Sequence, residues 1–324
     1  MENETNINRK YLYLTVFIAG MSTLAVEFTT SRMLQTVYGT SNIVWANVIG
    51  LVLLFLTLGY FLGGKLADKR PFPSTFYQLV TLTGFSAVFF LLLTSVVLKS
   101  AASAMAAMQV GAIAGSLLVV VLALAIPVTL LGCMSPFAIR LAVHDVAEAG
   151  RVSGRIYATS TLGSLLGTYL PVLFTIPLLG SRITAVLFGT ILMVIGLVGL
   201  WQANKKSGLA LAVLAILLLP IILLWTRGDL KAYEGQIFET ESAYNYIQVV
   251  RWGDCNYLLL NEGQAFHSFY CDGGRVDNIS VWSIMLAAPY FTADPTIENA
   301  AVIGLAAGKL NITLTTDGGE TRVL

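Results

Sequence analysis

The run AAVIGLAAG, at Ala300–Gly308, is the stretch that decides which fold to expect near the end of this chain. An apolar segment breaks at Gly304 and meets a second glycine at Gly308. This pattern is typical of the first strand and phosphate-side turn of a nucleotide-binding α/β domain. The turn departs from a G-x-G-x-G pattern, and only Lys309–Leu324 follow it. That tail alternates and carries β-branched residues, so it predicts strand or loop where a helix would be expected.

The composition of the whole chain is that of a membrane protein. The 324 residues are 56% hydrophobic and only 11% charged, whereas soluble domains carry about a quarter charged residues. The net charge of +1 gives no basis for nucleic-acid binding. A polar leader, residues 1–10, precedes an apolar run that is too long for the core of a signal peptide.

Seven apolar runs are long enough to cross a bilayer, which takes about 20 residues. We predict them at Tyr11–Leu34, Ile43–Gly64, Phe76–Leu98, Val110–Leu131, Ile156–Leu179, Ile183–Trp201 and Leu209–Trp225.

Basic residues are unevenly shared between the alternating loops. One set of loops holds ten: Arg9, Lys10, Lys65, Lys69, Arg70, Arg140, Arg151, Arg155, Lys205 and Lys206. The other set holds four: Lys99, Arg182, Arg227 and Lys231. The positive-inside rule then predicts a cytoplasmic N-terminus and, with seven spans, an extracytoplasmic region after Trp225.

Two features inside the predicted spans invite a functional interpretation. Glu27 and Arg32 lie in the first run, where charged groups are expected to pair or to face a polar cavity. They form either a substrate or proton site or an interfacial ion pair that fixes helix packing. Small residues four apart, Gly59 with Gly63 and Gly163 with Gly167, predict close helix packing.

Several segments together resemble the bacterial membrane-anchored spermidine-synthase-like proteins of the polyamine aminopropyltransferase family. The membrane part of that resemblance rests on EFTTSRMLQTVYGTSNIVWANVIG (Glu27–Gly50), LGYFLGGKLADKRP (Leu58–Pro71), SPFAIRL (Ser135–Leu141) and GRIYATSTLGSLLGTYLPVLFTIPLLGSR (Gly154–Arg182). The soluble part rests on ESAYNYIQVV (Glu241–Val250), YLLLNEGQAFHSFY (Tyr257–Tyr270), LAAPYF (Leu286–Phe291) and AAVIGLAAG.

The resemblance implies a fold and a chemistry for the soluble part. In the family, a small β-domain covers a pocket in which a Rossmann-like domain holds decarboxylated S-adenosylmethionine, and a carboxylate activates the attacking amine. By this resemblance, Asn245, Gln264, Gly304 and Gly308 match positions near that nucleotide, although for Asn245 and Gln264 we favour the interpretation as ordinary polar residues of a sheet. The ribose-binding and catalytic acids would fall beyond Leu324, so we expect no catalytic residue and no cofactor in the chain as given.

The residues of the soluble region predict a hairpin independently of that resemblance. Tyr246–Arg251 and Asn256–Leu260 are β-rich runs around the turn Trp252–Cys255. Cys255 and Cys271 flank the second run and form either a disulfide or two free thiols. Cysteine and histidine show no metal-ligand spacing. Asp277–Tyr290 predicts a helix, and Glu298–Leu305 a buried strand.

The expected fold is therefore an all-α bundle of seven transmembrane helices, then a small β-rich domain, then the first strand of a Rossmann-like α/β domain. The predicted boundaries are 1–10 for the leader, 11–226 for the membrane domain, 227–276 for the hairpin domain and 277–324 for a truncated methyltransferase-like start.

Three functions are compatible with this organisation. The first is a non-catalytic binding or scaffold subunit of the bacterial inner membrane, in contact with lipid and with a partner subunit or a second copy of itself. The second is an aminopropyltransferase that uses decarboxylated S-adenosylmethionine, if the domain is completed. The third is a polyamine transporter, which needs acidic residues deep in the spans, whereas Glu27 is the only carboxylate in the seven runs.

Overall fold

The computed structural model describes residues 8–108, 112–205, 208–213, 215, 230–231, 233–263, 265–272 and 291. The chain divides into two compact units. The first holds Met1–Lys231 with Glu241–Ala243, and the second holds Ala232–Thr240 with Tyr244–Leu324. The predicted helix at Asp277–Tyr290, the strand at Glu298–Leu305 and the glycine turn lie outside the described residues.

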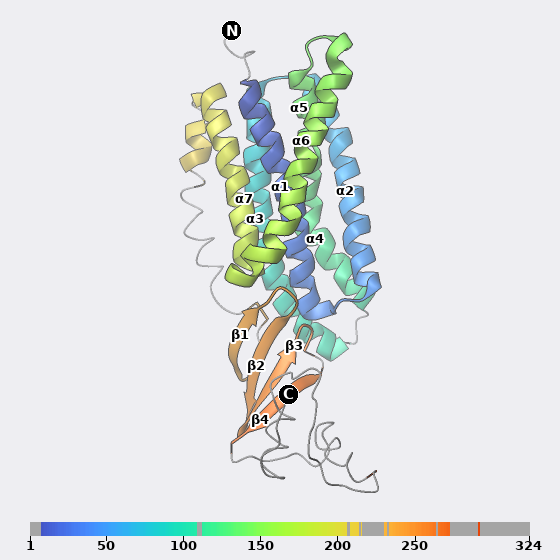
Figure 1. Cartoon of the computed structure of the whole chain (residues 1–324), viewed down its shortest axis with the longest axis vertical. Coiled ribbons are helices and arrows are strands. Elements are labelled where there is room, and N and C mark those ends of the chain that lie inside the picture. The colour runs from blue at the N-terminus through green and yellow to red at the C-terminus, as the bar shows by residue number, and fades with distance from the viewer. Residues whose placement is uncertain are drawn as a thin grey trace. The chain divides into compact units, whose positions relative to one another are not determined.

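The first unit is helical (Figure 1). Its elements are α1 (Arg9–Tyr38), α2 (Asn42–Lys69), α3 (Pro73–Met108), α4 (Ala112–Gly132), α5 (Met134–Ala142), α6 (Ala149–Leu170), a π-helical turn η3 (Pro171–Thr175) and α7 (Ile176–Ala203), with a short 3-10 turn η2 (Val146–Glu148) before α6. Side chains cap the first two helices at their N-termini: Asn8 accepts from the backbone of Lys10, and Ser41 accepts from the backbone of Val44.

Five helical segments among the described residues are long and apolar enough to cross a bilayer. They are Arg9–Tyr38, Asn42–Lys69, Pro73–Thr94, Ile113–Ala142 and Val146–Ala203. These segments coincide with the first six predicted runs, because the fifth covers two of them. Of the seventh run, residues 209–213 and 215 are helical and the rest lies outside the described part, so the number seven stays a prediction.

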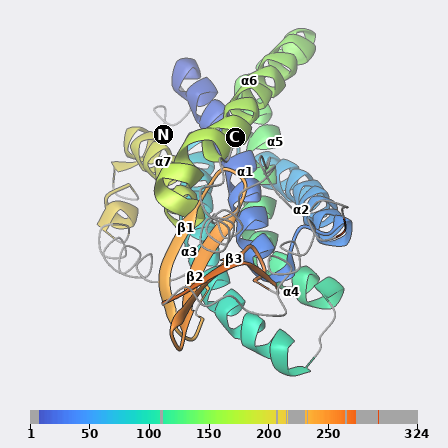
Figure 2. The same ribbon diagram turned by 60° about the horizontal axis from the view of Figure 1, so that its bottom comes forward.

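The segment Val146–Ala203 folds back on itself. A straight helix of its 58 residues would be about 87 Å long, far more than a bilayer needs. Gly180 interrupts it with φ 81° and ψ 162°, a conformation essentially restricted to glycine. The ribbon turns back between α6 and α7 (Figures 1 and 2). As a result, α6 runs parallel to α1, and the arm after Gly180 runs antiparallel to it.

Glycines let the helices meet at their backbones. A Cβ atom on Gly163 would lie 2.0 Å from the carbonyl oxygen of Phe17, and one on Gly167 would lie 2.0 Å from that of Met21. On α2, Cβ atoms at Gly59 and Gly63 would likewise collide with the backbone of α4 and of Cys133. The packing role predicted for these two glycine pairs is therefore confirmed.

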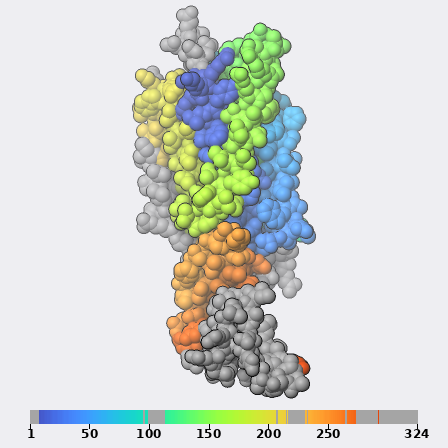
Figure 3. Space-filling view, in the orientation of Figure 1, coloured from blue at the N-terminus to red at the C-terminus, as the bar shows by residue number. Residues whose placement is uncertain are grey.

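Apolar side chains lie both inside and outside the helical unit. Phe76, Phe137, Leu12, Ile156 and Leu192 are completely buried in one core cluster. Large apolar side chains are also exposed on the outer faces of the helices, among them Phe61, Leu62, Leu165 and Phe174. Figure 3 shows α1, α6 and α7 side by side on one face. An exposed apolar surface of this kind fits contact with lipid.

The second unit contains a four-stranded antiparallel sheet of order β1-β2-β3-β4. The strands are β1 (Gln236–Glu241), β2 (Tyr246–Trp252), β3 (Cys255–Leu260) and β4 (Phe266–Cys271). β2 and β3 form the predicted hairpin, with Trp252 opposite Cys255 across a two-residue turn whose Gly253 has φ 59°. A β-bulge between Leu258 and Leu259 shifts the register with β4.

Candidate functional site

A nearly buried ion pair lies near the C-terminal end of α1. The Arg32 Nε atom lies 4.0 Å from Oε1 of Glu241, and the two side chains are only 11% and 8% exposed. Arg32 also donates from Nη2 to the backbone oxygen of Ser242, at 2.6 Å. The segment Glu241–Ala243 belongs to the helical unit, so this arginine joins α1 to a segment far along the chain.

The carboxylate of Glu241 also caps the second arm of the folded-back helix. Ser181, the first residue after Gly180, donates to it from its backbone nitrogen and, at 2.6 Å, from its hydroxyl. A helix N-terminus carries unsatisfied N–H groups and a partial positive charge, so a carboxylate is favourable there. Arg32, Ser181 and Glu241 together form what we call the charged clamp.

Two further cations lie beside the charged clamp. Lys231 is buried and donates from Nζ to the backbone oxygen of Thr36 at 3.1 Å, one turn beyond Arg32. A cation there complements the partial negative charge at the C-terminal end of α1. Arg182 follows Ser181 and is also buried. Within the described residues, the carboxylate of Glu241 is therefore the single acid beside three cations at this end of the helical unit, which are Arg32, Arg182 and Lys231.

A cavity of about 150 Å³ borders the charged clamp. Its walls come from α1, α2, η3 and α7 together with Ala243: the polar side chains of Ser31, Arg32 and Gln35, the rings of Phe28 and Trp45, and the aliphatic Val172 and Ile176. One cation, one amide and one hydroxyl among aromatic rings suit a small polar or anionic group.

Glu27 is not the acidic partner of Arg32. Among the described residues, Arg32 pairs with Glu241 and no ion pair joins it to Glu27. The reason is geometric, because residues five apart on a helix point about 140° away from each other. A partner from the other end of the chain carries no local signal, so the sequence did not point to Glu241.

The candidate nucleotide-binding residues are only partly described. Asn245 accepts a hydrogen bond from Nδ2 of Asn261 at 3.0 Å, and Asn261 in turn accepts from the backbone nitrogen of Tyr246 at 3.1 Å. These bonds hold the loops at one end of the β2–β3 hairpin. Gln264, Gly304 and Gly308 lie outside the described residues.

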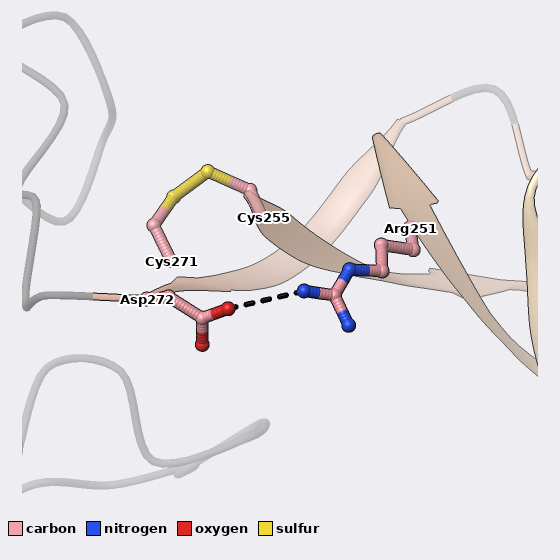
Figure 4. The surroundings of a disulfide bond; sticks show 4 residues. All are labelled: Arg251, Cys255, Cys271 and Asp272. Atoms are coloured by element: carbon pink, nitrogen blue, oxygen red, sulfur yellow. Dashed lines mark hydrogen bonds and ion pairs between the residues drawn. A yellow bond between two sulfur atoms is a disulfide. The ribbon is translucent and has the colours of Figure 1, made fainter. Parts of the chain in front are cut away.

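The cysteine pair of the sheet is bonded. A disulfide joins Cys255 to Cys271, which are opposite each other on β3 and β4 (Figure 4). Beside it Arg251 donates from Nη2 to Oδ2 of Asp272 at 3.1 Å, and both side chains are more than half exposed. Of the two alternatives for these thiols, the structure has the disulfide.

No family model, curated protein or solved structure matches this chain. In the part of the chain that the structure describes, no group of three or more His, Cys, Asp or Glu side chains could hold a metal ion.

Proposed function

We propose that this protein is a multi-pass inner-membrane protein that acts as a non-catalytic binding or scaffold subunit of a membrane assembly. The observation that carries this proposal is the charged clamp. Glu241 accepts from both donors of Ser181 and faces Arg32, so this buried acid is committed to holding helices and chain segments in place. A site built from internal contacts of this kind suits a rigid support.

The sheet lies on the extracytoplasmic side in this proposal. Disulfides persist in oxidising compartments and are rare in the cytosol, which favours that side for Cys255 and Cys271. The excess of basic residues beside the start of α1, the end of α2 and the start of α6 favours the cytoplasm for that end of the helical unit. Adenosyl cofactors are made in the cytoplasm, so a sheet outside it would not meet them.

The proposal predicts an assembly without aminopropyl transfer. We expect the protein solubilised from its native membrane with a mild detergent to run as a defined complex well above its own mass of 34.9 kDa. Incubated with decarboxylated S-adenosylmethionine and putrescine, it should form no more spermidine than a sample without protein. Native mass spectrometry and chromatography of the amines measure the two results. A monomer, or turnover that depends on the protein, would contradict the proposal.

A further inference from the structure

A second cavity, of about 210 Å³, lies within the membrane-spanning part of the helical unit. Residues of α1, α2, α4, α5 and α6 line it. Seven of its lining side chains carry hydroxyl groups and none carries a charge; the seven are Thr23, Tyr60, Ser135, Tyr157, Ser160, Thr161 and Ser164. The rest of the wall is aliphatic side chain and glycine, as at Gly20 and Gly132.

Most of these hydroxyl groups make no hydrogen bond among the described residues. Thr23 donates to the backbone oxygen of Ala19 at 2.8 Å, and Ser164 donates to that of Gly20 at 3.0 Å. The remaining five, on Tyr60, Ser135, Tyr157, Ser160 and Thr161, make no hydrogen bond within the described part of the chain. None of the five is among the fully buried polar atoms without a partner in the described residues, so a molecule from outside the chain can reach them. In a bilayer a hydroxyl group without an acceptor is costly, so these five favour a ligand that supplies acceptors.

The cavity extends from the hydrocarbon interior, at Thr23 in the middle of α1, toward the basic ends of α2 and α6, where Tyr157 lies only two residues from Arg155. Tyr60 lies nine residues before Lys69 on α2, and Ser160 lies nine residues after Arg151 on α6, which is about 14 Å along either helix. Two exposed basic residues lie closer to these lining residues: Lys65 is about 8 Å along α2 from Tyr60, and Arg155 is about 8 Å along α6 from Ser160.

The mouth of the cavity faces sideways, toward lipid. Tyr60 on α2 is 48% exposed and Tyr157 on α6 is 53% exposed, and both line the cavity. Thr161 is exposed as well. Because α2 packs on α4 and α5 while α6 packs on α1 and α5, the opening lies between α2 and α6.

We propose that this cavity binds the ester-linked glycerol segment of a phospholipid, which enters from the bilayer between α2 and α6. Ester carbonyl oxygens accept hydrogen bonds and donate none, which matches a wall rich in unpaired hydroxyl donors. The absence of charge from the wall leaves the phosphate outside, within reach of Lys65 and Arg155. The volume leaves no room for whole acyl chains, which stay in the bilayer. This inference goes beyond the scaffold function and does not depend on it.

Photochemical crosslinking tests this inference. The full protein is placed in nanodiscs of phosphatidylethanolamine and phosphatidylglycerol that contain a phosphatidylglycerol analogue with a diazirine next to one ester group. After illumination, we expect adducts concentrated on peptides that contain Tyr60, Tyr157 or Thr161. The triple variant Tyr60→Phe, Tyr157→Phe, Thr161→Val keeps the shape of the wall and removes three donors. Its yield of adducts at this site should fall at least about tenfold.

A matched control and a second variant keep the test decisive. Tyr169→Phe removes a hydroxyl from an exposed position on α6 outside the cavity, and it should crosslink as the wild type does. Ser135→Leu fills the cavity from α5 and should also suppress adducts if the triple variant proves unstable. Equal yields in the triple variant, the filled variant and the control, or adducts spread evenly around the helices, would overturn the proposal and leave water as the occupant.

Discussion

Gly163→Leu is expected to separate α1 from α6 and to lower the free energy of unfolding by about 3 kcal/mol. The first side-chain atom alone would stand 2.0 Å from the carbonyl oxygen of Phe17 and 3.0 Å from the backbone nitrogen of Met21. Both obstacles are backbone atoms of a helix and cannot rotate away as a side chain can. The helices would have to move apart along a contact that continues at Gly167.

A second glycine of α6 provides the control for this substitution. Nothing lies within 4 Å of a Cβ atom built on Gly154, so Gly154→Leu changes helix propensity and size without a clash. It should be neutral or slightly stabilising, because leucine is the better helix former. Unfolding in mixed micelles with rising sodium dodecyl sulfate, followed by circular dichroism, measures both variants. If Gly163→Leu unfolds at the same detergent fraction as Gly154→Leu, the backbone contact between α1 and α6 does not exist.

Glu241→Gln is expected to lower the free energy of unfolding by about 3 kcal/mol. The glutamine keeps an acceptor for Ser181 but leaves Arg32 without its carboxylate in a nearly buried place. It also removes a negative charge from the N-terminus of the arm that begins at Ser181. The loss of stability should be larger than the loss of hydrogen bonds alone would cause, because two other buried cations, Arg182 and Lys231, lie at the same end of the helical unit.

A double-mutant cycle with Arg32→Met isolates the pair. Removing both charges should cost less than the sum of the single changes, with a coupling of at least about 1 kcal/mol. The control is Glu148→Gln, which breaks an exposed pair with Arg151 and should cost at most about 1 kcal/mol. Additive losses at Arg32 and Glu241 would mean that these two side chains do not interact.

The local features of the helices could be predicted from the sequence. Apolar runs of spanning length carry their own signal, and six of them coincide with helices of the structure. Glycines four apart on one helix face predicted the contacts at Gly59 and Gly163, because the period of a helix alone decides which residues share that face.

Contacts between distant segments could not be predicted in this way. Glu27 and Arg32 were considered together because both lie in the first apolar run, while the acidic partner of Arg32 in the structure, Glu241, follows the last apolar run. Lys231 was counted as a loop charge, yet it is buried against the end of α1. The reversal at Gly180, by contrast, lies at the break predicted between the runs Ile156–Leu179 and Ile183–Trp201, because that break is marked locally by a glycine and Arg182.

In the soluble region, too, local structure could be predicted from the sequence, whereas pairing between separate segments could not. The hairpin of β2 and β3 follows from two β-rich runs around a tight turn. The pairing of Cys255 with Cys271 stayed open because it depends on the register of β4, which a bulge between Leu258 and Leu259 shifts.

The side of the membrane on which Cys255 and Cys271 lie tests the proposed function most directly. In a Cys133→Ala background, intact cells are treated with a membrane-impermeant reductant and then with an impermeant maleimide. A single cysteine introduced by Arg151→Cys, with the native cysteines replaced, reports on the end of the helical unit where α6 begins. We expect labelling of Cys255 and Cys271 in intact cells, and labelling of the Arg151→Cys variant only in inverted vesicles. The reverse pattern would place the sheet in the cytoplasm with the adenosyl cofactors and would contradict the scaffold proposal.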